Sequence, residues 1–127
     1  LEDRELRRIL IAMLRAREEE SALALIEQQL QQNGDLSRNP WLLQLRGDAL
    51  LGLAKHCSMT GKNRELPPGT RQRAWQQFRA YLDRAEHDLT QARDLGVDAQ
   101  LTVQIDKNMA FLARLRKDNQ TPRSGKG

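Results

Sequence analysis

The sequence predicts an all-α protein of about five antiparallel helices, joined as helical hairpins in a repeat-like array or an irregular bundle. Its most frequent residues include Arg, Leu, Gln and Ala, which are all good helix formers. Residues that favour strands are scarce, since Val occurs only at Val97 and Val103 and Tyr only at Tyr81. Apolar residues also recur every three or four positions, which is the spacing of one helical face.

The first two helices are predicted at residues 2–17 and 19–33. One apolar face of the first is formed by Leu6, Ile9, Leu10, Met13 and Leu14, and one face of the second by Leu23, Ile26 and Leu30. The acidic run Glu18–Glu20 suits the opening turn of the second helix, where negative charge is favourable. Asn33 and Gly34 should end it, because both tolerate the left-handed conformation found at helix ends.

The third helix is predicted at 40–57, with Asn39 as its cap and Pro40 in its first position. Its apolar residues cover most of its circumference, so it should be the central helix, packed on several sides. Gly47 and Gly52 each weaken a helix, which favours close approach of a neighbouring helix at these positions.

An irregular segment is expected at 58–69, because Gly61, Pro67, Pro68 and Gly69 disfavour a helix. Thr70 should cap a fourth helix at 71–95, with one apolar stripe formed by Trp75, Phe78, Leu82, Ala85, Leu89 and Ala92. Gly96 should end this helix, and Asp98 should cap a fifth at 99–117.

The 127 residues fit a single helical domain, predicted at 1–117, followed by a basic disordered tail at 118–127.

The cellular compartment is predicted from the cysteine content and from the lack of long apolar segments. One cysteine, Cys57, excludes an internal disulfide and fits a reducing compartment. No apolar run is long enough to span a bilayer and no secretory signal is visible, so we expect a cytoplasmic protein without membrane insertion. The chain begins with Leu1 rather than Met, so the parent protein is expected to be longer.

The residues that usually carry chemistry have structural interpretations here, and we predict no catalytic residues, metal or cofactor. His56 and Cys57 are adjacent and would point about 100° apart on a helix, which is unsuitable for a nucleophile and its base. Cys57 is expected to be a buried packing residue. The carboxylates of the fourth helix are expected on a solvated face: Asp83, Glu86, Asp88 and Asp94.

The aromatic residues are divided between core and surface. Trp75 and Phe78 lie on the apolar stripe of the fourth helix, so both are expected in the core. Trp41 lies in the first turn of its helix, after a loop, and is the aromatic residue expected to be partly exposed.

The predicted hairpins resemble tetratricopeptide repeats over about residues 5–95. Ala74 and Phe78 match the second-helix pair of that family, Gly47 and Leu50 can take the Gly and Tyr positions of the first helix, and Ala22 with Ile26 matches the end of a preceding repeat. The sequence departs from the family where the 58–70 segment lengthens the repeat and where Glu86 replaces the expected proline. The resemblance implies a curved helical array that holds a peptide or protein on its concave face.

We therefore expect a non-enzymatic protein–protein interaction module that binds a peptide or partner protein, and a second copy of the chain is another candidate partner. The expected partner-binding residues are Trp41, Lys55, Lys62, Arg64, Arg71 and Arg73. One alternative is a nucleic-acid-binding helical domain that uses the basic 55–73 segment and the tail. Another alternative is a helical subdomain of a larger enzyme.

Overall fold

The computed structural model describes residues 2–96 and 98–119, and within these ranges all regular structure is helical. The prediction of an all-α fold is therefore confirmed. The described residues form five α-helices and one short 3-10 helix, in the order α1 (Asp3–Arg15), α2 (Glu19–Gln32), η1 (Gly34–Arg38), α3 (Pro40–Lys62), α4 (Pro68–Asp94) and α5 (Ala99–Asp118). The predicted tail lies mostly outside the described residues, although its first residue, Asp118, is the last residue of α5.

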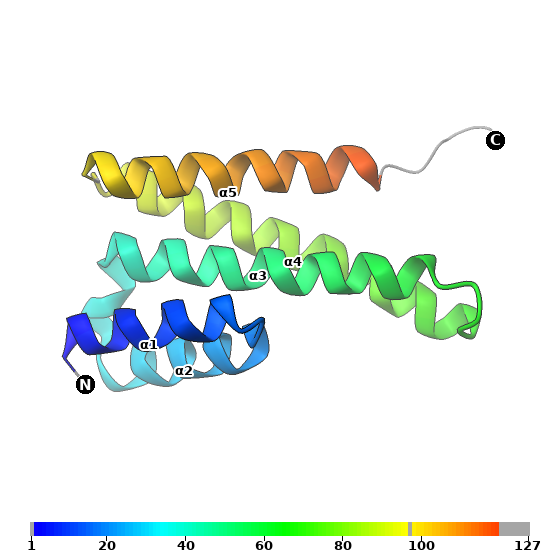
Figure 1. Cartoon of the computed structure of the whole chain (residues 1–127), viewed down its shortest axis with the longest axis horizontal. Helices are drawn as coiled ribbons and strands as arrows, with labels where there is room; N and C mark the ends of the chain where they lie inside the picture. The colour runs from blue at the N-terminus through cyan, green and yellow to red at the C-terminus, as the bar shows by residue number, and fades with distance from the viewer. Residues whose placement is uncertain (1, 97, 120–127) are drawn as a thin grey trace.

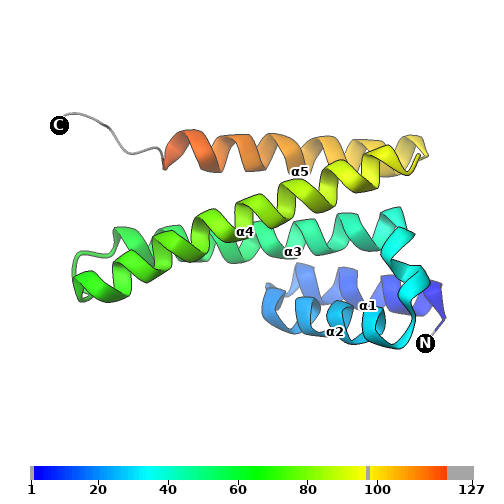
Figure 2. The same cartoon turned by 180° about the vertical axis from the view of Figure 1, so that it is seen from behind.

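The central helix is α3, as predicted, because it packs against every other helix. Its largest contact is with α4, which returns alongside it and crosses it at an angle (Figures 1 and 2). Helices α1 and α2 lie on one side of α3, and α5 lies on the other side of the α3–α4 pair (Figure 1). The far end of the α3–α4 pair extends beyond α1 and α2.

Two apolar clusters hold these helices together, and α3 contributes to both. The larger one joins α3, α4 and α5 through buried side chains such as Leu50, Phe78 and Ile105. The smaller one joins α1 and α2 to the first turns of α3 through Leu6, Ile26 and their neighbours. The half-buried Trp41 packs against both clusters, so the start of α3 connects the two parts of the core.

The connection between α3 and α4 is shorter than the sequence predicts. Helix α3 continues to Lys62 through Gly61, and α4 already begins at Pro68. Gly61 is needed here because a Cβ atom at this position would lie 2.5 Å from Cε2 of Trp75. The prediction of an irregular segment from 58 was wrong because Gly61 serves helix packing, and Pro68 occupies a first-turn position that tolerates proline.

Other helix ends follow the sequence predictions in part. The Oδ1 atom of Asp98 accepts a hydrogen bond of 2.8 Å from the backbone N–H of Leu101, which confirms this cap of α5. Gly96 adopts φ +84° after α4, as expected for a glycine that ends a helix. Asn39 is the N-cap residue of α3 and Pro40 its first residue, as predicted, although the Asn39 side chain makes no capping hydrogen bond. The predicted cap at Thr70 was wrong, because Thr70 lies inside α4.

The two central glycines mark close approaches of different kinds. A Cβ atom on Gly47 would lie 2.8 Å from Cγ of Leu89 in α4, so Gly47 lets the α3 and α4 backbones come together. A Cβ atom on Gly52 would lie 2.6 Å from Cγ of Glu19, a side chain of α2. The expected close approach is confirmed at Gly47, whereas Gly52 makes room for a single acidic side chain.

An ion pair between the half-buried Arg46 and the buried Asp88 joins α3 to α4. The guanidinium of Arg46 donates two hydrogen bonds, of 2.7 and 2.9 Å, to the carboxylate of Asp88. The residue Asp88 is only 3% exposed, so its predicted place on a solvated face was wrong. Arg46 also contacts Glu27 of α2 at 3.3 Å, and its pKa is raised, chiefly by the hydrogen bond to Asp88. A carboxylate can lie in the core here because arginine provides a two-pronged partner.

The connection between α1 and α2 holds Arg17 in the left-handed region, at φ +63°. The backbone N–H groups of Arg17 and Glu18 donate to the carbonyl groups of Leu14 and Met13, in the pattern that closes a helix with a left-handed residue. Glycine usually occupies this position because a side chain strains it. Arg17 is thus a charged side chain held at a strained position.

Replacing Arg17 with glycine is expected to raise the free energy of unfolding by roughly 0.5–1 kcal/mol, because the left-handed strain is removed. Urea denaturation of the wild type and the variant measures this difference. The control is Arg17→Ala, which loses the same exposed contact with Glu19 but keeps the strain, so it should bring no gain. Equal stability of the glycine and alanine variants would contradict the strain at this position.

Candidate functional site

The predicted partner-binding residues do not form one surface. Trp41 and Lys55 lie near the N-terminal end and the middle of α3, whereas Lys62 and Arg71 lie at the far end of the α3–α4 pair and line a separate groove. Arg64 and Arg73 are exposed around the α3–α4 connection. The basic 55–73 segment is therefore divided between two regions. It does not form one compact loop, because residues 55–62 belong to α3.

Two of these residues also have structural contacts. Trp41 is half-buried, and the guanidinium carbon of Arg7 lies 6.0 Å from its ring centroid. This arrangement matches the expected partial exposure. Arg71 donates from Nε to the carbonyl oxygen of Gly61 at 3.0 Å, so it helps to close the end of α3.

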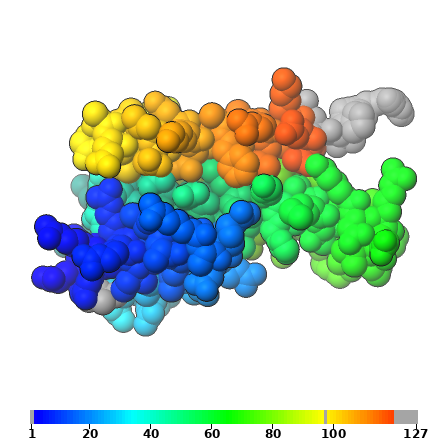
Figure 3. All heavy atoms as spheres, in the orientation of Figure 1, coloured from blue at the N-terminus to red at the C-terminus, as the bar shows by residue number. Residues whose placement is uncertain are grey.

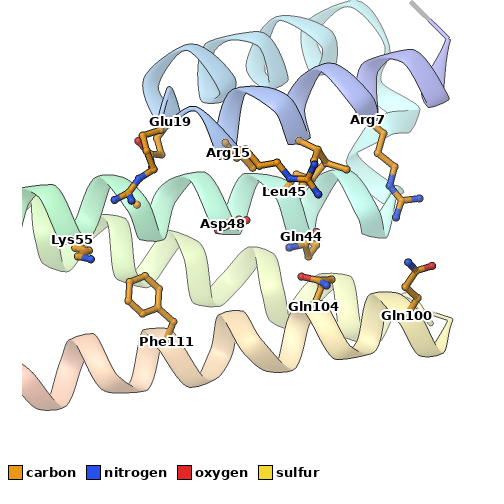
Figure 4. Close-up of a pocket in the computed structure, with 14 residues that line it drawn as sticks. Arg7, Arg15, Glu19, Gln44, Leu45, Asp48, Lys55, Gln100, Gln104 and Phe111 are labelled. Atoms are coloured by element: carbon orange, nitrogen blue, oxygen red, sulfur yellow. The ribbon is translucent and has the colours of Figure 1, made fainter.

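A groove lies between α1 and α5, with α3 as its floor, and we call it the central groove. Its volume is about 530 Å³. Figure 3 shows α1 and α5 as two ridges on this face, with α3 between them. Figure 4 shows the side chains that line it, which come from α1 (Arg7, Ile11, Leu14, Arg15), the α1–α2 connection and α2 (Arg17, Glu19), α3 (Gln44, Leu45, Asp48, Gly52, Lys55) and α5 (Gln100, Gln104, Phe111).

Asp48 lies at the middle of this floor (Figure 4). Within residues 2–96 and 98–119 its half-buried carboxylate has no hydrogen-bond or ion-pair partner. Its pKa is raised, first by burial and second by the negative charge of Glu19. An acidic group in such surroundings gains from any ligand that brings a positive charge or a hydrogen-bond donor.

Side-chain amides continue the polar surface from Asp48 towards α5. Gln44 is buried, and its Nε2 donates to Oδ1 of Asn108 at 2.7 Å, which fixes its position between α3 and α5. Gln104 lies directly across from Gln44, and Gln100 lies farther along α5 (Figure 4). Both α5 amides are exposed, so they can donate to and accept from a ligand.

Cations surround the groove. Arg7 and Arg15 reach in from α1, and Lys55 lies near Phe111 towards the other end (Figure 4). The strained residue Arg17 also lines it. The site therefore has an acidic centre, side-chain amides on its floor and along α5, and a rim in which Arg7, Arg15 and Lys55 outweigh the paired Arg17 and Glu19. Together these groups suit a polar ligand with charges of both signs.

One row of residues along α3 is a sequence signal of this groove that the sequence predictions missed. Gln44, Asp48, Gly52 and Lys55 are spaced by four, four and three positions, so they form one row without apolar side chains on a helix that is otherwise apolar. Such a row on a central helix indicates a side that its neighbours leave open. The α5 residues of the groove could not be assigned from sequence, because their role depends on how α5 packs.

The other chemically suggestive residues have structural roles or stand apart. Cys57 is buried, as predicted, and its burial raises the pKa of the thiol, while the neighbouring His56 is exposed. In the part of the chain that the structure describes, no three His, Cys, Asp or Glu side chains are close enough to hold a metal ion. None of the described helices combines the length and apolarity needed to cross a membrane.

Comparison of the chain with protein-family models, with curated proteins and with solved structures finds no match. Its function is therefore inferred from the geometry of the chain itself.

Proposed function

We propose that this chain is a non-enzymatic protein–protein interaction module that holds an extended segment of a partner protein in the central groove. The observation that carries the proposal is the half-buried carboxylate of Asp48, which has no partner among the described residues and lies beside side-chain amides. The resemblance of residues 5–95 to tetratricopeptide repeats supports the same use of a helical groove.

The partner segment should carry one basic side chain for Asp48. An ammonium or guanidinium group would neutralise this carboxylate and form a charge-assisted hydrogen bond with it. Acidic side chains on either side of that residue would face Arg15 and Lys55 on the rim. The groove thus favours a segment in which a basic residue stands between acidic ones.

The spacing of the amides suits an extended backbone. Gln100 and Gln104 are four positions apart on α5, which is a rise of roughly 6 Å along a helix. An extended chain repeats its orientation every second residue, or roughly every 6.6 Å. Two glutamine amides on one helical face can therefore bond to alternate peptide groups of a segment that runs along the groove.

Selection of ten-residue peptides from a displayed random library on the immobilised protein tests this function. We expect the selected peptides to share a basic residue between acidic ones, and to lose at least tenfold in affinity for Asp48→Asn, measured by fluorescence polarisation. The variant should remain folded, because it removes a carboxylate that has no partner among the described residues. The control Asp106→Asn changes an exposed carboxylate of α5 outside the groove and should bind normally.

The pH dependence gives a second readout of the same experiment. Because the pKa of Asp48 is raised, its charge is lost at a higher pH than for an ordinary aspartate as the solution is acidified. Wild-type affinity should therefore fall as the pH falls through this raised pKa, and Asp48→Asn should lack that step. Selected peptides without a common charge pattern, or with equal affinity for both proteins, would refute the proposal.

The nucleic-acid alternative would use the other basic region instead. Lys62, Arg64, Arg71 and Arg73 lie around the α3–α4 connection, and phosphate contacts made there would give affinity that falls steeply with salt. A labelled oligonucleotide titrated at two salt concentrations against Arg64→Glu/Arg73→Glu and against Asp48→Asn distinguishes the two functions. Sub-micromolar oligonucleotide binding that only the first variant abolishes would favour this alternative.

A further inference from the structure

A second groove, which we call the distal groove, lies between the N-terminal half of α4 and the C-terminal end of α5. Figure 2 shows that these helices diverge from their connection, so they are far apart at this end. The groove has a volume of about 990 Å³, near the upper limit for small-molecule sites. It is lined by Lys62, Pro68, Arg71, Gln72, Trp75, Phe78, Arg79, Leu82, Asp83, Arg116, Asp118 and Asn119.

Its floor is apolar and aromatic. The rings of Trp75 and Phe78 meet edge to face, with centroids 5.4 Å apart and planes at 90°. Leu82 continues this floor one turn beyond Phe78, and both are buried. Trp75 is only half-buried, although it lies on the apolar stripe, so part of its ring remains available to a ligand.

Cations of α3 and α4 line the groove beside this floor. Arg71, Trp75 and Arg79 follow one another at intervals of four positions, so a guanidinium lies one helical turn before and one turn after the indole. Lys62 adds a third cation from the end of α3. Neither Lys62 nor Arg79 forms an ion pair within the described parts of the chain.

The carboxylates of the groove do not neutralise these cations. Asp83 is held by Arg116 at 3.1 Å, and the same guanidinium lies 2.9 Å from Glu86. The other lining carboxylate, Asp118, is exposed at the end of α5. Lys62, Arg71 and Arg79 therefore leave a local excess of positive charge beside an apolar surface.

We propose that the distal groove binds a small amphipathic anion, with an aromatic or branched apolar body against Trp75, Phe78 and Leu82 and a carboxylate or sulfonate group between Lys62 and Arg79. An apolar body gains by leaving water on this floor, and the anionic group is favoured by the adjacent cations. The site is independent of the central groove, so it extends the proposed function without depending on it.

Titration with anilinonaphthalene sulfonate tests the proposal, because this fluorescent probe combines an aromatic body with one sulfonate. We expect saturable binding with energy transfer from Trp75. The double variant Lys62→Gln/Arg79→Gln should bind at least tenfold more weakly, with an unchanged melting temperature. The matched control Arg93→Gln/Lys107→Gln removes two exposed cations outside both grooves and should bind as the wild type does.

Two further measurements locate the probe. In a proton–nitrogen NMR spectrum, the indole signal of Trp75 should shift on binding and that of Trp41 should not. The uncharged probe Nile red should bind the wild type and the double variant equally. Three results would each overturn the proposed anion site in the distal groove. They are the absence of saturable binding, equal affinity of the two double variants for the sulfonate, and a shift of the Trp41 signal in place of the Trp75 signal. The Asp48→Asn variant should bind the sulfonate normally, which separates failure here from failure of the central groove.

Discussion

Replacing Arg46 with leucine is expected to lower the free energy of unfolding by about 3–5 kcal/mol, because the change leaves a buried carboxylate without its partner. Asp88 is 3% exposed and receives two hydrogen bonds from the Arg46 guanidinium. Leucine cannot donate either bond, so Asp88 must remain charged in the core or take up a proton. Urea denaturation followed by circular dichroism measures the loss.

The double variant Arg46→Leu/Asp88→Leu should recover much of this stability, because it removes both charges together. Arg84→Leu is the matched control, since Arg84 is half-exposed and its ion pair within the described residues is with Glu27, at 3.6 Å. Its effect should stay below about 1 kcal/mol, as for other surface ion pairs. A loss for Arg46→Leu no larger than for Arg84→Leu would show that the pair of Arg46 with Asp88 adds no more stability than a surface ion pair.

Replacing Phe78 with alanine is expected to cost about 3–5 kcal/mol, the usual effect of removing a buried aromatic ring. Phe78 is 4% exposed and belongs to the core shared by α3, α4 and α5. Its loss would leave a cavity and remove the edge-to-face contact with Trp75. The same denaturation experiment measures the change.

The conservative variant Phe78→Leu should cost much less than Phe78→Ala, because leucine fills most of the space that the ring occupied. A cost below about 1 kcal/mol for Phe78→Ala would contradict the contribution of this ring to the core shared by α3, α4 and α5.

The fold class could be predicted from the sequence because helix periodicity is a local property. The stripe from Trp75 to Ala92 predicts α4, and Asp98 predicts the start of α5, without knowledge of the rest of the molecule. The end of α3 could not be predicted in this way. Gly61 disfavours a helix by itself, and it is helical because the ring of Trp75 lies against it.

The difference between local sequence patterns and contacts between distant residues also explains why the candidate sites were only partly predicted. Lys55, Lys62 and Arg71 were identified by charge, and each lines one of the two grooves. Asp48 was missed because charge alone does not distinguish it from a solvated carboxylate. Its local signal is the row without apolar side chains that it shares with Gln44, Gly52 and Lys55 on α3. Asp88 was misplaced for a related reason, since its partner Arg46 lies 42 positions away in the chain.

The order of the helices along the chain has a consequence for the rate of folding. The largest helix contact joins α3 to α4, which are consecutive, and each of the other packed helices contacts a sequence neighbour. Contacts between nearby segments require only short loops to close, so little chain entropy is lost before they form. Proteins dominated by such local contacts fold in microseconds to milliseconds. The α3–α4 pair can thus form early as a template, on which α1, α2 and α5 then assemble the two grooves.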